Sequence, residues 1–123
     1  MLEDFYSIIN ETVAGNTAII TVRFNVNHPI FQGHFPTMPV VPGACLVEMV
    51  SLLSSKVLGK KLQLLSAQNI KFVQVIHPDK VESVSFDILW TEAEEGYATK
   101  CLVHNEEGTF AMMKVTLCES VFN

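Results

Sequence analysis

The stretch GACLVEMVSLLSSKVL, residues 43–58, decides how the rest of the chain must fold. Its apolar residues would point almost all the way round a helix, which indicates burial on most sides. Pro42 stands beside the first position and Gly59 follows the last one, and these residue types commonly begin and end helices. We therefore expect a helix of about four turns inside the protein.

The sequence on both sides of this helix has the patterns of β-strands. Between residues 81 and 92, for example, apolar and polar residues alternate, so that one face of the expected strand is apolar. Short segments rich in turn-forming residues separate the runs. The expected strands cover residues 4–12, 17–26, 62–76, 81–92, 97–105 and 109–119. This order predicts a single α+β domain over residues 1–123, with an antiparallel sheet curled around one central helix.

The composition excludes several classes of function. The 123 residues include 8 basic and 13 acidic side chains, and the net charge of −5 argues against a sequence-independent nucleic-acid binder. No run reaches the roughly 18 to 20 apolar residues that span a bilayer, and the first residues lack the features of a signal peptide. We expect a soluble, cytoplasmic protein without a membrane partner. Only 17% of residues are charged, which favours an apolar face covered by a second copy.

The three cysteines give no sign of metal or redox chemistry. Cys45, Cys101 and Cys118 are an odd number and lack the close paired spacings of a zinc site or redox motif. We expect free thiols in a reducing compartment and no metal. Cys45 stands near the expected helix start, where we prefer a small buried residue to a nucleophile.

The segment that precedes the helix carries the candidate chemistry. Residues 27–42 contain four prolines and no periodic pattern, which predicts a stiff, shaped loop. The loop holds His34, whose neutral imidazole can accept a proton, and Glu48 lies about one and a half turns inside the helix, where a buried carboxyl group can donate one. Backbone N–H groups around Gly43 suit an oxygen that gains negative charge. Together these groups predict an elimination beside a carbonyl group.

Each of these residues also has a purely structural interpretation. Glu48 could belong to a solvent-exposed stripe shared with Ser51 and Ser55 at helical spacing. Pro42 and Gly43 could simply begin the helix. We interpret the other histidines as surface residues, because none has a partner at metal-ligand spacing; they are His28, His77 and His104.

The order of these residues resembles a known family. Gly33-His34-Phe35-Pro36, then Pro39, then Pro42-Gly43, then Glu48 is similar to the signature of the 3-hydroxyacyl-[acyl-carrier-protein] dehydratases of fatty acid synthesis. The later strands match that family in length and order. The sequence departs from the family pattern at several positions, which suggests a divergent member; they are Thr37, Ala44, Cys45, Leu52 and His77-Pro78.

The resemblance implies a fold and a set of roles. The fold is the hotdog fold, a curled antiparallel sheet wrapped around one long central helix, and two copies join edge to edge as a homodimer. His34 of one copy would act as the base and face Glu48 of the other, which would handle the β-hydroxyl. The Gly43 N–H would bind the thioester carbonyl, and the Val40 carbonyl would orient the imidazole. Three neighbouring residues are candidates for lining the acyl tunnel: Phe31, Phe35 and Met38.

The function implied by the resemblance is dehydration of a 3-hydroxyacyl thioester to the trans-2-enoyl thioester, in fatty acid or related lipid or polyene biosynthesis. No cofactor is implied. The substrate would arrive on an acyl carrier protein or on coenzyme A, and the homodimers could assemble into a trimer of dimers. A hotdog acyl thioesterase and a non-catalytic acyl-binding subunit remain alternatives. Because carrier proteins are acidic, docking needs a basic patch, for which the candidates are Lys56, Lys60, Lys61 and Lys71.

Overall fold

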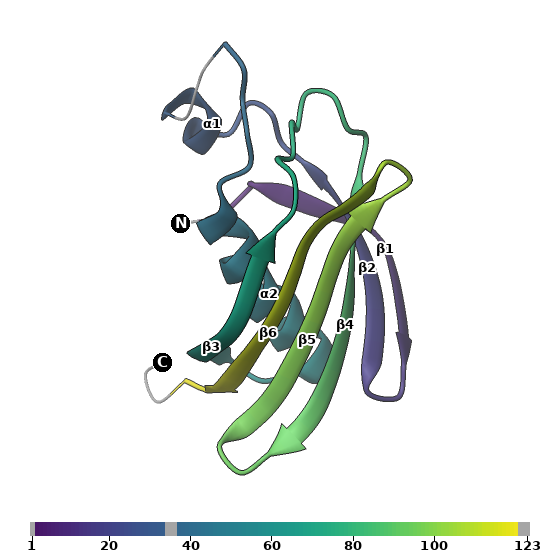
Figure 1. Ribbon diagram of the computed structural model, residues 1–123, viewed down its shortest axis with the longest axis vertical. Coiled ribbons are helices and arrows are strands. Elements are labelled where there is room, and N and C mark those ends of the chain that lie inside the picture. The colour runs from purple at the N-terminus through teal and green to yellow at the C-terminus, as the bar shows by residue number, and fades with distance from the viewer. Residues whose placement is uncertain (1, 34–36, 121–123) are drawn as a thin grey trace.

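The computed structural model describes residues 2–33 and 37–120. Within these residues the chain forms six strands and two helices (Figure 1). In chain order they are β1 (Tyr6–Ala14), β2 (Thr17–Phe24), α1 (Pro29–Gly33), α2 (Gly43–Leu58), β3 (Leu62–Phe72), β4 (Val84–Ala93), β5 (Gly96–Asn105) and β6 (Gly108–Glu119).

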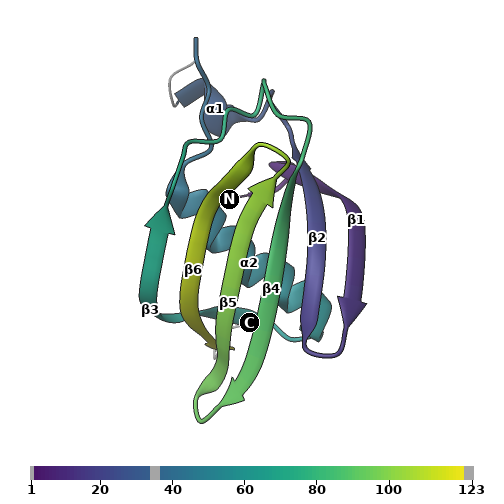
Figure 2. The ribbon, with the colours of Figure 1, turned by 45° about the vertical axis from the view of Figure 1, so that its right-hand side comes forward.

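The six strands form one antiparallel sheet in the order β1-β2-β4-β5-β6-β3. Three of its neighbouring pairs are hairpins, whereas β3 follows α2 and pairs with β6 at the far edge. The sheet curls around α2, which lies behind β4, β5 and β6 when the sheet is viewed from outside (Figures 1 and 2). This topology leaves β1 and β3 as the two edge strands.

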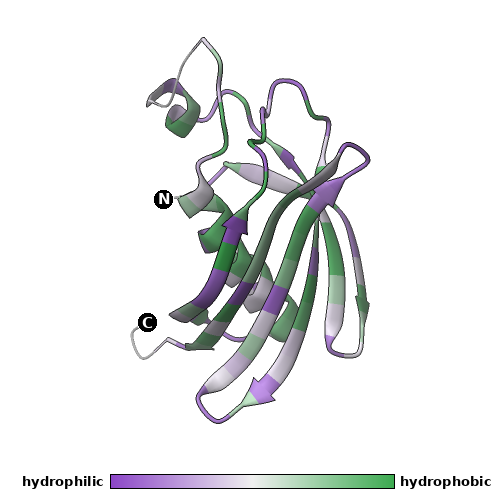
Figure 3. Cartoon of the chain, in the orientation of Figure 1, coloured by the Kyte–Doolittle hydropathy of each residue, from purple (hydrophilic) through white to green (hydrophobic). Residues whose placement is uncertain are grey.

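The core lies between α2 and the concave face of the sheet. Alternate residues of β4, from Val84 to Trp90, are buried, which confirms the apolar face expected from the alternation. The apolar character of α2 continues along most of its length (Figure 3). The indole Nε1–H of Trp90 donates a buried hydrogen bond of 2.8 Å to Ser54 Oγ, so the one polar atom of this large side chain is satisfied.

The helix prediction is confirmed at both ends, while several strand ends were wrong. α2 covers residues 43–58, and Gly59 closes it at a φ of 67°, with its N–H donating to Ser55 O. The first strand begins at residue 6 rather than 4, and the third ends at 72 rather than 76. β3 ends early because the N–H groups of Val73 and Gln74 both donate to Phe110 O, which takes the chain out of the ladder.

A second helix, α1, occupies part of the segment expected to be an irregular loop, so α2 is not the single helix of the described chain. His28 Nδ1 accepts a hydrogen bond of 3.1 Å from the Ile30 N–H, which caps the first turn of α1. The other ring nitrogen therefore donates, at 2.8 Å, to Glu3 O. His28 is buried and stacks edge-on against Phe5, so the prediction of a surface residue was wrong.

The three cysteines are free thiols. Cys45 and Cys101 are buried, and burial followed by nearby negative charge raises the pKa of both thiols. This environment confirms the interpretation of Cys45 as a small buried residue, because a reactive thiol needs a lowered pKa. Neither helix in the described part of the chain is long and apolar enough to cross a membrane.

Candidate active site

The first turn of α2 presents backbone donors to the surface. Pro42 precedes the helix in an extended conformation, with φ −62° and ψ 140°, and no side chain caps this end. The N–H groups of Cys45 and Leu46 both donate to Pro42 O, at 3.0 and 3.4 Å. Among the described residues nothing accepts a hydrogen bond from the N–H of Gly43. This donor, with the positive end of the helix dipole behind it, can hold an oxygen that gains negative charge.

Phe72 lies against this turn, a neighbour that the sequence did not predict. A Cβ added to Gly43 would lie 2.6 Å from Phe72 Cζ and 2.8 Å from Cε2. Only glycine therefore allows the ring to approach so closely. Phe72 is the last residue of β3 and is 52% exposed, so its ring forms one wall beside the helix start while remaining open to solvent on the other side.

Glu48 lies on the exposed side of α2, one and a half turns beyond Gly43. At 1.5 Å per residue, the two positions are separated by about 7.5 Å along the axis. The exposed residues of the helix follow the four-residue spacing Ala44, Glu48, Leu52 and Lys56. The prediction of an exposed stripe formed by Glu48, Ser51 and Ser55 was wrong for the two serines. Ser51 is buried, and the Ser55 hydroxyl bonds to backbone atoms.

The carboxylate of Glu48 affects two neighbouring side chains. The pKa of Tyr6 is raised, first by burial of its phenol and then by the negative charge of Glu48. The pKa of Cys45 is raised by the same two causes in the same order. Tyr6 comes from the first position of β1, so strand and helix bring a phenol and a carboxylate to the same side of the molecule.

Two contacts fix the segment that leads into α2. The N–H of Val41 donates to Ile76 O at 3.0 Å, and Nδ1 of His77 lies 3.2 Å from Pro39 O. Both partners belong to the connection between β3 and β4, so this connection holds residues 39–41 in place. Val40 is partly buried between these two contacts, and His77 has a structural partner rather than being a free surface residue.

The remaining predicted site residues do not gather at one place. Phe31 is buried and stacks on Phe5 with ring centroids 5.0 Å apart, whereas Met38 is 55% exposed. His34 and Phe35, on which the predictions of a base and a tunnel wall fall, lie outside the described residues. Of the three expected catalytic groups, the structure therefore describes the Gly43 N–H and the Glu48 carboxylate.

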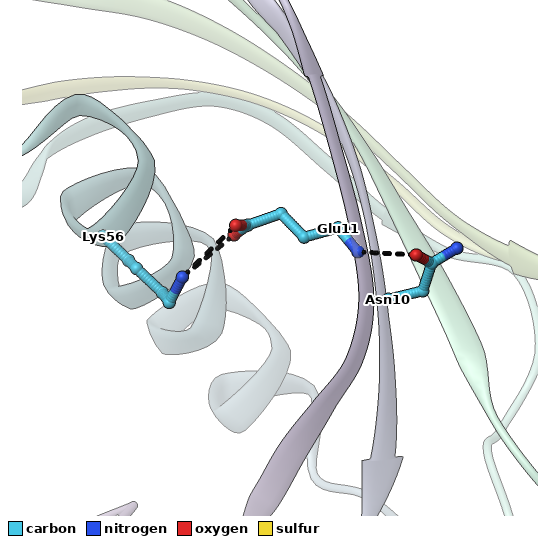
Figure 4. A network of polar contacts seen from close by, with 3 residues as sticks. All are labelled: Asn10, Glu11 and Lys56. Atoms are coloured by element: carbon cyan, nitrogen blue, oxygen red, sulfur yellow. Dashed lines mark hydrogen bonds and ion pairs between the residues drawn. The ribbon is translucent and has the colours of Figure 1, made fainter.

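The lysines proposed as a docking patch are spread over the molecule. Lys56 Nζ forms an ion pair with the carboxylate of Glu11 on β1, at 3.2 and 3.3 Å (Figure 4). Lys60 Nζ donates to the hydroxyl of Tyr97 at 2.7 Å. Lys71, by contrast, lies on β3 next to Phe72 and is exposed.

Curated relatives support the resemblance to the fatty acid dehydratases. The chain is 31% identical over 84 residues to the 3-hydroxyacyl-[acyl-carrier-protein] dehydratase FabZ of Lactiplantibacillus plantarum, covering 63% of this chain and 57% of that enzyme. It is 26% identical over 123 residues to FabZ of Geobacter metallireducens, covering 90% of this chain and 81% of the relative. The match to FabZ of Pediococcus pentosaceus covers 62% of that enzyme.

A solved structure and a family model extend the comparison. The structure of the dehydratase heterocomplex ApeI:P from Xenorhabdus doucetiae matches with a TM-score of 0.75 and 21% identity, covering 92% of this chain and 97% of the other. This likeness confirms the fold of a curled antiparallel sheet and helix. Residues 10–112, well over half of the chain, match the sequence model of the ApeI-like family, described as ApeI dehydratase. The chain therefore belongs to the ApeI-like dehydratase family.

Proposed function

We propose that this chain dehydrates a 3-hydroxyacyl thioester to the trans-2-enoyl thioester. The observation that carries the proposal is the geometry of α2, where the N–H of Gly43 has no acceptor among the described residues and Glu48 stands exposed about 7.5 Å further along the axis. Membership of the ApeI-like family and the names of the FabZ relatives support the same reaction.

The reaction divides between three groups. His34 would accept the proton from the α-carbon while the N–H of Gly43 donates to the thioester oxygen, which gains negative charge. Glu48 would donate a proton to the departing β-hydroxyl, so that one C–H and one C–O bond break, a C=C bond forms and water leaves. The Val40 carbonyl would orient the imidazole. Only protons and a hydroxyl group move, so the proposal includes no cofactor.

The exposure of Glu48 makes the proposal depend on a second copy. Burial is one way to disfavour the charged form of a carboxyl group, so that it can donate a proton at neutral pH. In one copy the stripe with Ala44 and Leu52 faces solvent, and Leu52 is 40% exposed. Covering this stripe would also remove apolar surface from water. We therefore propose that a partner surface closes over the stripe.

The edge strand β3 offers the place for that partner. β3 pairs with β6 on one side, and most of its residues are exposed. Leu64 and Leu65 are 42% and 45% exposed, and an apolar, unpaired edge of this length is prone to pair with another strand. Because Phe72 ends this strand against Gly43, pairing of two β3 edges would bring a second chain close to the helix start. We propose a homodimer joined in this way.

The substrate carrier and the location also belong to the proposal. An acyl carrier protein or coenzyme A would deliver the thioester, as the names of the FabZ relatives suggest for the carrier protein. Lys60 and Lys61 lie beyond the C-terminal end of α2, about 24 Å from Gly43 by the rise of its 16 residues, so they stand far from the reacting group. We propose a cytoplasmic location, where the three free thiols would stay reduced.

The test compares two site variants with a matched control. Glu48→Gln and His34→Ala should each lower turnover of a 3-hydroxyacyl thioester by about 10²-fold or more, because each removes a group that moves a proton. Glu107→Gln makes the same chemical change at an exposed turn and should retain full activity. Growth of enoyl absorbance with loss of water supports dehydration.

Two other results would contradict the proposal. Release of a free thiol, trapped by a disulfide reagent, without formation of the enoyl product would identify a thioesterase. Binding of acyl carrier protein with no turnover at any chain length would identify an acyl-binding subunit. Full activity in either site variant would remove that residue from the mechanism even if the reaction itself is correct.

A further inference from the structure

The outer face of the sheet, opposite α2, carries a second candidate site. A groove of about 630 Å³ crosses β2, β4, β5, β6 and β3, and its volume lies within the range of small-molecule sites. The five strands lie side by side on this face (Figure 2). The groove is separated from Gly43 and Glu48 by the thickness of the sheet, so it is not part of the proposed active site.

Three lysines line one end of the groove. Lys100 of β5 and Lys114 of β6 are directly opposite each other in the register, and Lys71 of β3 is the diagonal neighbour of Lys114. Directly opposed side chains have Cβ atoms about 4.5–5.5 Å apart, and like charges there are destabilising. In the described part of the chain none of these lysines forms an ion pair. A chain of net charge −5 thus keeps three lysines in one small area.

The one carboxylate that lines the groove is engaged elsewhere. Asp87 of β4 accepts a hydrogen bond of 3.0 Å from His104 Nε2. Asp87 is directly opposite Leu102 in the register and is the diagonal neighbour of Lys100. An anion in the groove would therefore bind on the β5 to β3 side, because Asp87 repels it from the β4 side.

The other end of the groove is apolar except for Asp87. Ile19 of β2 and Leu89 of β4 line this end; Asp87 is directly opposite Ile19, and Leu89 is directly opposite Lys100. Ile19 is 49% exposed and Met112 is 43% exposed, so both side chains offer apolar surface to a ligand. From Lys114 of β6 through Lys100 and Leu89 to β2, the sheet order gives three strand spacings, or about 14 Å, along which lysines are followed by uncharged residues.

We propose that this groove binds an anionic amphiphile, namely a medium-chain fatty acid with its carboxylate on Lys100 and Lys114 and its chain along Leu89 toward Ile19. The lysines provide charge complementarity to the carboxylate, and the apolar end removes the chain from water. A second copy of this chain fits less well, because a two-fold contact would place lysines against lysines. The proposal is independent of the dehydration reaction.

Decanoate titrated into the full chain, followed by backbone amide chemical shifts, tests the proposal. We expect shifts at residues of β5 and β6 that face the groove, and a Kd that rises at least tenfold in the double variant K100Q/K114Q. The matched control is Lys61→Gln, which removes an exposed lysine outside the groove and should leave the Kd unchanged. A cationic amphiphile of equal chain length, decyltrimethylammonium, should bind at least tenfold more weakly than decanoate.

The double variant should fold at least as well as the parent chain, because it removes an opposed pair of like charges. A thermal melt checks this. Decanoate shifts confined to the start of α2, an unchanged Kd in K100Q/K114Q, or no binding at millimolar decanoate would each overturn the proposal. Binding of acyl carrier protein to the same face in the absence of any decanoate binding would assign the lysines to a protein partner and also overturn it.

Discussion

Replacing Gly43 with alanine tests the proposed N–H donor without changing His34 or Glu48. The added Cβ would lie 2.6 Å from Phe72 Cζ. Because carbon atoms pack best at about 3.5–4.0 Å, the ring must move by roughly 1 Å. The ring is the far end of a flexible side chain that is 52% exposed, so it can move without disturbing the core.

The expected effects on stability and on rate differ in size. Alanine favours a helix over glycine by up to about 1 kcal/mol, which offsets part of the cost of displacing the ring. We therefore expect the free energy of unfolding to stay within about 1 kcal/mol of the parent value. The thioester must place its oxygen within reach of the N–H of residue 43, and a misplacement of about 1 Å can cost 10²-fold in rate. We expect kcat/KM to fall by about that factor.

The assay follows enoyl absorbance with a soluble 3-hydroxyacyl thioester, alongside urea denaturation of the same preparations. Phe72→Ala alone is the control, and the double variant G43A/F72A should recover part of the lost rate, because no ring is left to be displaced. Because alanine keeps the N–H, full turnover in Gly43→Ala would refute the inference that the thioester must approach residue 43 as closely as glycine allows. A large loss of stability in that variant would show instead that glycine is needed for packing.

Two further predictions concern the core. Trp90→Phe removes the buried donor to Ser54 Oγ, so the free energy of unfolding should fall by about 1–3 kcal/mol in urea denaturation, and an unchanged value would contradict the importance of this bond. The pKa of the Cys101 thiol is raised above its ordinary value of 9.0 by burial and then by Asp87, so the folded chain keeps a proton that the unfolded chain releases. Below about pH 9 the thiol is protonated in both states, so it does not lower the free energy of unfolding. As the pH rises above that value, the free energy of unfolding falls by up to about 1.4 kcal/mol per pH unit. Cys101→Ala should flatten this decline in urea denaturation between pH 8 and pH 10.5, and an equal slope in both chains would be inconsistent with a buried thiol.

The ends of α2 could be predicted from the sequence because local residues decide them. Pro42 cannot donate a hydrogen bond, and Gly59 adopts a positive φ that other residues rarely accept. The end of β3 depends instead on a partner distant in sequence. The apolar run continues to Ile76, but the carbonyl of Ile76 accepts a hydrogen bond from the N–H of Val41. Ile76 therefore holds the loop before α2 and does not pair in the sheet.

α1 was missed for a similar reason. Its five residues are too few to form a stable helix alone, and its first turn is held by a histidine rather than by a usual capping residue. Pro29 at the first position suits a helix start, but the segment after it is too short to show a helical pattern. Burial of Phe31 against Phe5, far away in the sequence, supplies the packing that fixes the turn.

For the candidate site, the sequence predicted the spacing of residues along the helix better than their neighbours in the fold. The spacing of Gly43 and Glu48 on one helix follows directly from its pitch. The contact of Phe72 with Gly43 does not, because it depends on β3 being the edge strand that passes the helix start. The same topology leaves the apolar residues of β3 unpaired on one side and Glu48 exposed on α2. A partner that covers β3 to protect this edge would therefore reach the start of α2 as well, so we infer that assembly and catalysis use one continuous surface.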